Sequence, residues 1–186
     1  MCPGRVVAAA DARSVRHTGR TPFLKGWLAA LYLWLKLLHV AAVVAFLGNI
    51  TTGLFWHTHA ARTRDPRLLV HAVGGIIRSD RLFTIPGVVV IIVSGVALAF
   101  IGGLPILRTP WILWSLVLFG VSGLVFVLRV APLQVQLRAL AQAGVEQGAL
   151  DWGRYQRLAH AWELWGAVAL LTPMAAFVLM VLKPSF

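Results

Sequence analysis

Residues 37–56 read LLHVAAVVAFLGNITTGLFW, twenty residues without Asp, Glu, Lys or Arg. A transmembrane helix needs about 20 mostly apolar residues to cross a hydrocarbon core of about 30 Å. Within a bilayer each backbone amide must be paired inside its own segment, which an α-helix achieves. The stretch therefore predicts a membrane-spanning helix. Apolar residues begin earlier, at Trp27, so the full span is expected at about 27–56, with Lys36 reaching back to the interface.

Three more apolar runs follow, at about 82–101, 111–130 and 161–182. They are about twice as long as the strand of a membrane barrel, which favours helices. Tryptophans lie near the ends of the runs, as in an interfacial aromatic belt: Trp27, Trp56, Trp111, Trp162 and Trp165. The predicted fold class is all-α, a polytopic membrane protein with a bundle of four transmembrane helices in one domain, 26–186.

Composition agrees with a membrane protein. Of 186 residues, 59% are hydrophobic and 12% are charged, whereas about a quarter of a soluble domain is charged. The net charge is +11, but the basic residues cluster between the apolar runs, where they face anionic headgroups. We therefore expect the lipid bilayer as partner and no nucleic acid. The single cysteine, Cys2, excludes an internal disulfide and a thiolate metal cluster.

The polar segments have separate predictions. Residues 1–25 are Arg-rich and lack the apolar core of a secretory signal, so a disordered basic tail is expected. Asp65 and Pro66 suit the N-cap and first position of a helix. Apolar residues recur at helical spacing over 66–79, which predicts a short amphipathic helix lying on the membrane surface.

A second polar segment, 134–157, separates the last two spans. Leu133, Leu137 and Leu140 recur at helical spacing, so the third helix is expected to continue beyond the membrane. Gly144 and Gly148 would end this extension, and Asp151 would cap the helix that leads into the fourth span.

Orientation follows from the distribution of arginines. The first and third loops lie on one side and are rich in arginine: Arg62, Arg64, Arg67, Arg78, Arg81, Arg138, Arg154 and Arg157, with Arg129 at the edge. The other side has Arg108 and Lys183 besides the basic tail. The excess predicts that loops one and three are cytoplasmic and both termini are outside.

His39 is the first candidate for chemistry, because it lies about one turn inside the first span. Ionisable groups at membrane depth are costly and usually face a bundle interior. His39 is thus either an axial haem ligand or proton-relay group, or a neutral histidine hydrogen-bonded to a neighbouring helix. Polar partners at its depth would be Ser115 or backbone carbonyls freed by Pro173.

His57 follows His39 by eighteen residues, which is five helical turns, so both point the same way about 27 Å apart. Gly53 lies near the same line and would leave room for a flat cofactor. His57, His59 and His160 are expected on one side, where a bis-histidine haem b is geometrically possible. The candidate cofactor-binding residues are therefore His39, His57 and His160; the alternative is that the latter two are ordinary interfacial residues.

The remaining polar and small residues favour packing. His160, Glu163 and Arg157 are one turn apart and predict an interfacial salt-bridge patch, with proton handling as the alternative. Asn49, Thr51 and Thr52 are expected to hydrogen-bond between helices. Small residues in the second and third spans allow close helix approach: Gly95, Ala99, Gly120 and Gly123. The sequence has no complete catalytic motif and no metal site, so an enzyme is not the favoured prediction.

Three motifs occur in order: Leu35-Lys36-Leu37-Leu38-His39, Asp65-Pro66, and Met180-Val181-Leu182-Lys183-Pro184. Through these three motifs and their order, the chain resembles an uncharacterised bacterial family of predicted integral membrane proteins, domain-of-unknown-function family two-two-six-nine. The resemblance covers about residues 31–184. The resemblance implies a multi-pass protein of the bacterial inner membrane.

The chain is also distantly similar to haem-containing protoporphyrinogen oxidase and to copper-resistance D membrane proteins, through the Lys-x-x-His opening and terminal Lys-Pro. This similarity implies a haem-ligand role for His39. The oxidase's tryptophan three residues before the first-span glycine is Ala45 here, before Gly48, and its third-span histidine has no counterpart.

Two functions follow from these observations. The first is an accessory or assembly subunit that packs against other membrane proteins or itself. The second is a haem-binding redox protein that uses His39 or the cytoplasmic-side histidines; as an enzyme it would be a haem-dependent oxidoreductase.

Overall fold

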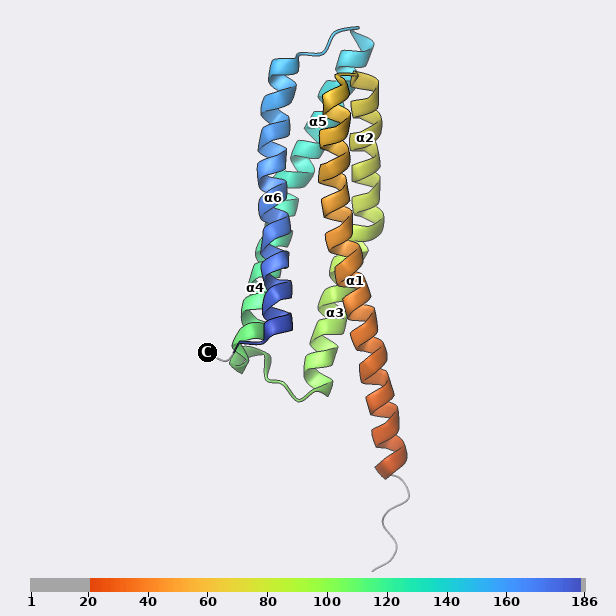
Figure 1. Ribbon diagram of the computed structural model, residues 1–186, viewed down its shortest axis with the longest axis vertical. Helices are drawn as coiled ribbons and strands as arrows, with labels where there is room; N and C mark the ends of the chain where they lie inside the picture. The colour runs from red at the N-terminus through yellow and green to blue at the C-terminus, as the bar shows by residue number, and fades with distance from the viewer. Residues whose placement is uncertain (1–20, 185–186) are drawn as a thin grey trace, which may run out of the picture.

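Four long helices lie side by side in the computed structural model, which describes residues 21–184, with side chains from Gly26 onward (Figure 1). No strand occurs within that range. All four helices are long and apolar enough to cross a membrane. The predicted all-α, four-span architecture is therefore confirmed.

The four long helices follow one another along the chain, and the second and third each contain a π-helical turn. The first long helix is α1, Thr21–Thr63. The second comprises α2 (Pro66–Ser79), the π turn η1 (Asp80–Thr84) and α3 (Ile85–Ile101). The third, after a short 3₁₀ turn η2 (Ile106–Arg108), comprises α4 (Pro110–Val125), the π turn η3 (Phe126–Val130) and α5 (Ala131–Glu146). The fourth is α6, Trp152–Leu182.

The start of α1 corrects one predicted boundary. The basic tail was expected to extend to residue 25, but residues 21–25 are helical. The rest of that prediction, residues 1–20, lies outside the described residues.

Each π turn ends two residues before a proline, Pro86 or Pro132. A proline inside an α-helix removes one hydrogen bond and clashes with the carbonyl four residues earlier. Membrane helices tolerate proline through local π adjustments of this kind. The two turns thus keep both helices continuous where their sequences would otherwise break them.

The predicted caps are present. Asp65 accepts a hydrogen bond from the backbone N–H of Arg67 at 2.8 Å, and Asp151 accepts one from Arg154 at 2.9 Å. These carboxylates satisfy N–H groups that the first turn of a helix leaves unpaired. Lys183 ends α6 in a left-handed conformation, with φ of 45°.

The helices are longer than a bilayer is thick. The 36 residues from Pro66 to Ile101 extend for about 54 Å at 1.5 Å per residue, against a hydrocarbon core of about 30 Å. Helices α3 and α4 contain no Asp, Glu, Lys or Arg. Charged residues occur in α2, in α5 and in the first turns of α6. We therefore place the membrane around α3 and α4 and call this part the membrane half. We call α2, α5 and the adjoining ends of α1 and α6 the extramembrane half.

Residues 66–79 form the predicted helix, but its expected position on the membrane surface is wrong. Instead α2 runs beside α1 and continues through η1 into α3 (Figure 1). Its apolar stripe of Leu69, Val73 and Ile76 is buried in the protein core, mainly against α5. An apolar stripe can be covered by lipid or by another helix, and here α5 covers it.

The two halves are packed differently. The largest cluster of buried apolar residues joins all four helices in the extramembrane half, with Leu69, Leu137 and Tyr155 almost inaccessible. In the membrane half α1 pairs with α3 and α4 pairs with α6. Large apolar side chains such as Val93 and Phe100 point outward there, as expected for surfaces in contact with lipid.

Two serines of α4 donate hydrogen bonds to backbone carbonyls of α6. Pro173 lacks an N–H, which frees the carbonyl of Ala169 four residues earlier. The Ser122 hydroxyl donates to this carbonyl at 2.6 Å. Ser115 donates to the carbonyl of Ala176 at 3.2 Å. The polar groups proposed as partners of His39 are thus used between α4 and α6.

Candidate functional site

His39 faces α3. Its Nδ1 lies 3.0 Å from the Oγ of Ser94, which itself donates to the carbonyl of Val90. Because the serine proton is used in that bond, the network assigns the donor role to His39 Nδ1–H. The ring also packs on Gly95, where an added Cβ would lie 3.0 Å from His39 Cε1. A hydrogen bond to a neighbouring helix was one of the two predictions for His39, although Ser94 was not among the predicted partners.

His57 is fully buried in the extramembrane half. Its Nε2 lies 3.1 Å from the hydroxyl of Tyr155, and its ring centroid is 4.7 Å from that of Trp162. Its Nδ1 lies 3.4 Å from Oε1 of Glu163, close enough for an ion pair but without hydrogen-bond geometry. All three neighbours are on α6, so His57 joins the end of α1 to the start of α6.

His160 does not join this group. It is exposed on α6, as is His59 on α1, whose ring contacts Trp56. Glu163 pairs with His57 rather than with His160, so the predicted patch of His160, Glu163 and Arg157 is replaced by a contact between helices.

A bis-histidine haem does not fit these positions. Both ring nitrogens of His57 face protein groups, and the space beside Gly53 is filled by Ile76, 3.5 Å from a Cβ placed there. For His39, the printed side-chain hydrogen bond uses Nδ1, toward Ser94, and not Nε2. Among the described residues, no group of three or more His, Cys, Asp or Glu is placed to hold a metal ion.

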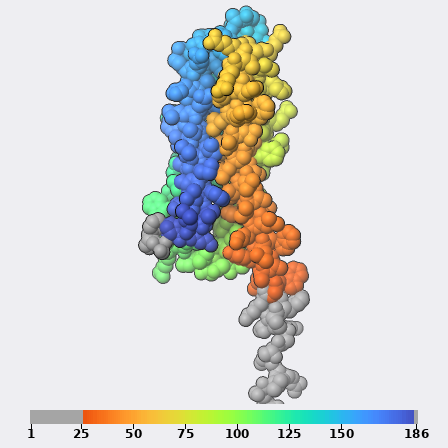
Figure 2. Space-filling model, in the orientation of Figure 1, coloured from red at the N-terminus to blue at the C-terminus, as the bar shows by residue number. Residues whose placement is uncertain are grey.

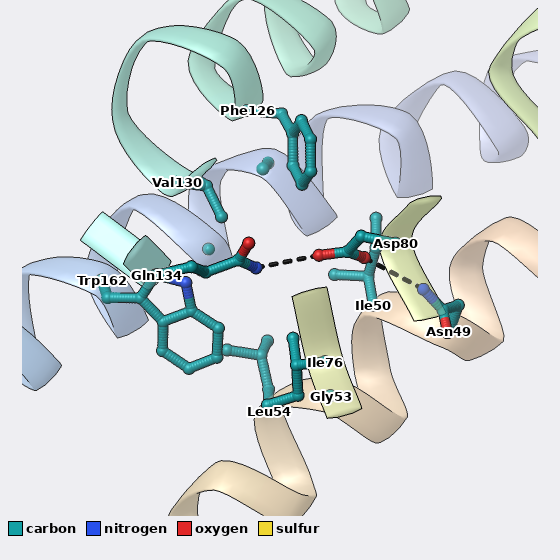
Figure 3. Close-up of a pocket in the computed structure, with 12 residues that line it drawn as sticks. Asn49, Ile50, Gly53, Leu54, Ile76, Asp80, Phe126, Val130, Gln134 and Trp162 are labelled. Carbon is teal, nitrogen blue, oxygen red and sulfur yellow. Dashed lines mark hydrogen bonds between the residues drawn. The ribbon is translucent and has the colours of Figure 1, made fainter. Parts of the chain in front are cut away.

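A polar cluster around Asp80 was not predicted as a site. Asp80 is the first residue of η1 and is 7% exposed. Its Oδ1 accepts hydrogen bonds from Asn49 Nδ2 on α1 at 3.0 Å and from the Thr84 hydroxyl at 2.8 Å. Its Oδ2 accepts one from Gln134 Nε2 on α5 at 2.8 Å (Figure 3). The cluster thus ties three helices together where the two halves meet.

A small cavity lies beside this cluster. Its volume is about 20 Å³, and Asn49, Asp80, Gln134 and Trp162 supply the polar part of its lining (Figure 3). Trp162 is 3% exposed, and its indole Nε1 has no hydrogen-bond partner in the described protein. The site therefore combines a carboxyl group, two amides and an unsatisfied donor.

Two signals in the sequence point to this cluster. An acidic residue at the edge of an apolar span is a functional hypothesis in its own right, and Asp80 lies just before the predicted second span, 82–101. Asn49 was correctly predicted to bond between helices. The same prediction was wrong for Thr51, whose hydroxyl donates to the carbonyl of Leu47 in its own helix. Thr52 is exposed.

Comparison with protein families matches residues 33–184 to the family described as "Predicted integral membrane protein (DUF2269)". The chain belongs to this family. The match covers most of the chain and confirms the resemblance drawn from the three motifs. Comparison with curated proteins and with solved structures found no match. The DUF2269 description gives a membrane location without an activity, so function rests on the site and the surfaces.

Proposed function

We propose that this DUF2269 protein is an accessory or assembly subunit of the bacterial inner membrane that binds other membrane proteins through exposed helix faces. The observation that carries the proposal is the first part of α1, which extends past the end of α3 (Figures 1 and 2). Large apolar side chains surround it, exposed to 46–70%: Leu28, Leu31, Leu33, Trp34 and Leu37. A helix that is apolar on all sides needs cover from lipid or from other helices, and we propose that other helices cover this one.

Glycines in the membrane half give further support. Gly48 on α1 and Gly120 and Gly123 on α4 have no other atom within 4 Å of an added Cβ. Small residues allow close approach between membrane helices, and nothing in the described chain occupies these positions. They are open to a helix from another subunit or from a second copy.

Orientation is part of the proposal. The arginine-rich loops lie at the extramembrane half, so we place this half in the cytoplasm and both termini outside. With an even number of spans, the two ends of the chain lie on one side. Partners in the cytoplasm would meet the polar helices, and partners in the membrane would meet α1 and α4.

Photo-crosslinking in cells tests the association. A photoreactive amino acid in place of Leu33 or Trp34 is expected to give an adduct with a membrane protein that mass spectrometry identifies. Val93, 63% exposed on α3, is the matched control and is expected to yield no protein adduct. If the α1 positions capture only lipid, the subunit role is wrong.

One observation favours haem binding as the second candidate. Ser94 fixes His39 Nδ1, which leaves Nε2 as the nitrogen for iron, and metal-bound histidines have such an outer partner. An absorbance spectrum of the purified protein separates the two functions. A Soret band near one haem per chain, lost in His39→Ala, would favour the redox role.

A further inference from the structure

Trp162 has a buried donor that the protein itself does not satisfy. Its side chain is almost inaccessible, and its Nε1–H has no acceptor among the described residues. Nearly all buried polar groups in folded proteins have a partner, and an exception calls for an explanation such as bound water. Figure 3 draws the indole nitrogen on the side of the ring toward Gln134.

The cavity next to Trp162 has the size of one water molecule. Its volume is about 20 Å³, whereas a single water needs roughly 10–15 Å³ by the same measure. Gly53 and Gly166 form part of its wall. A Cβ on Gly166 would lie 3.2 Å from Leu54, so the position is already tight.

The polar groups around the cavity define the chemistry of its ligand. The ligand must accept a hydrogen bond from Trp162 Nε1 and must also suit the oxygens of Asp80 and Gln134. A cation cannot accept from the indole, and an anion is unfavourable beside a carboxyl group. Water meets both needs. It donates to a carboxylate and accepts from a carboxylic acid, so it suits Asp80 in either protonation state.

We propose that this cavity is a binding site for one ordered water molecule that bridges Trp162 Nε1 to the Asp80–Gln134 pair. The water extends the Asp80 cluster to α6, so that one polar network joins α1, η1, α5 and α6. It also hydrates the buried carboxyl group of Asp80 at the level where the protein leaves the membrane. This inference is independent of the proposed subunit role.

Nuclear magnetic resonance of the full-length protein in detergent, with ¹⁵N-labelled tryptophan, tests the site. The Trp162 indole signal is assigned by its loss in Trp162→Phe, with Trp165→Phe as the control. We expect a cross-peak between the Trp162 indole proton and water. In Gln134→Leu the indole signal should remain and the water cross-peak should be lost.

Two results would overturn the proposal. One is an indole signal of Trp162 without a water cross-peak in the parent protein, which would mean a dry cavity. The other is a melting temperature that falls when NaCl is replaced by choline chloride at equal ionic strength in the parent but not in Asp80→Asn. That dependence would identify the ligand as a cation. An unchanged melting temperature excludes a sodium ion as the ligand.

Discussion

Gln134 on α5 donates a 2.8 Å hydrogen bond to Asp80 on η1, joining residues 54 positions apart in the chain. Gln134 is 4% exposed and Asp80 is 7% exposed. The bond is a directional contact between two helices that otherwise pack mainly through apolar side chains. It therefore helps to fix the register between α2 and α5 at the membrane boundary.

Gln134→Leu should destabilise the protein because it leaves the Asp80 carboxyl group short of a donor. An unsatisfied buried polar group costs about 1–3 kcal/mol. The matched control is Gln136→Leu on the same helix, whose side chain is exposed and whose effect should stay within about 0.5 kcal/mol. Thermal unfolding in detergent measures both. Equal melting temperatures for the two variants would contradict a structural role for the Asp80 cluster.

His57→Ala should be among the more damaging single substitutions in the extramembrane half. It removes a fully buried ring from between Tyr155 and Trp162 and leaves the Tyr155 hydroxyl without its partner. We expect a loss of about 2–5 kcal/mol, as for large-to-small changes in a core. His59→Ala, two residues later and exposed, should unfold like the parent. Similar losses from both variants would show that the burial of His57 does not matter.

Much of the fold was predictable because length and hydropathy decide it. Charge-free runs of about 20 residues allow few structures in a bilayer, and Asp65 and Asp151 mark helix starts by simple cap chemistry. The position of α2 was not predictable. Its stripe of Leu69, Val73 and Ile76 suits a lipid surface as well as a protein core, and only the pairing with α5 distinguishes them.

The site was less predictable than the fold. Helical spacing correctly places His39 and His57 on one helix, but it does not show which residues on other helices face them. Ser94 and Tyr155 carry no signal of their own in the sequence. Asp80 lies between the predicted surface helix and the predicted second span, because the π turn that joins them into one helix cannot be read from composition. Gln134 lies in the predicted extension of the third helix, but nothing in the sequence shows that it faces Asp80.

The extension of α5 beyond the membrane predicts different accessibility along one continuous helix. In a Cys2→Ser background, Gln142→Cys should react rapidly with a water-soluble maleimide, because this exposed position is in the extramembrane half. Val121→Cys on α4 is also exposed in the protein but should react slowly, since lipid covers it. Equal labelling rates would mean that the membrane boundary is not between these two positions.

Reporter fusions test the proposed orientation. A reporter joined after Phe186 should behave as periplasmic, and one inserted at Gly148 in the third loop should behave as cytoplasmic. The reason is the arginine excess on the side of loops one and three. A cytoplasmic signal from the fusion after Phe186 would reverse the orientation while leaving the four spans intact.

The contact between His39 and Gly95 predicts a dependence of one substitution on the other. A Cβ at Gly95 would lie 3.0 Å from His39 Cε1 and 3.5 Å from Nδ1, so Gly95→Ala must push the ring away from Ser94. Overpacking of this kind typically costs about 1–3 kcal/mol.

In a His39→Ala background the obstacle is gone, and alanine is favoured over glycine in a helix by about 0.5–1 kcal/mol. Gly95→Ala should therefore destabilise the parent but leave His39→Ala unchanged or more stable. Gly75→Ala on α2, where no atom lies within 4 Å of the new Cβ, is the control and should be harmless in both backgrounds. Thermal unfolding of the four combinations at positions 39 and 95 measures the coupling, and strictly additive effects would show that His39 does not pack on Gly95.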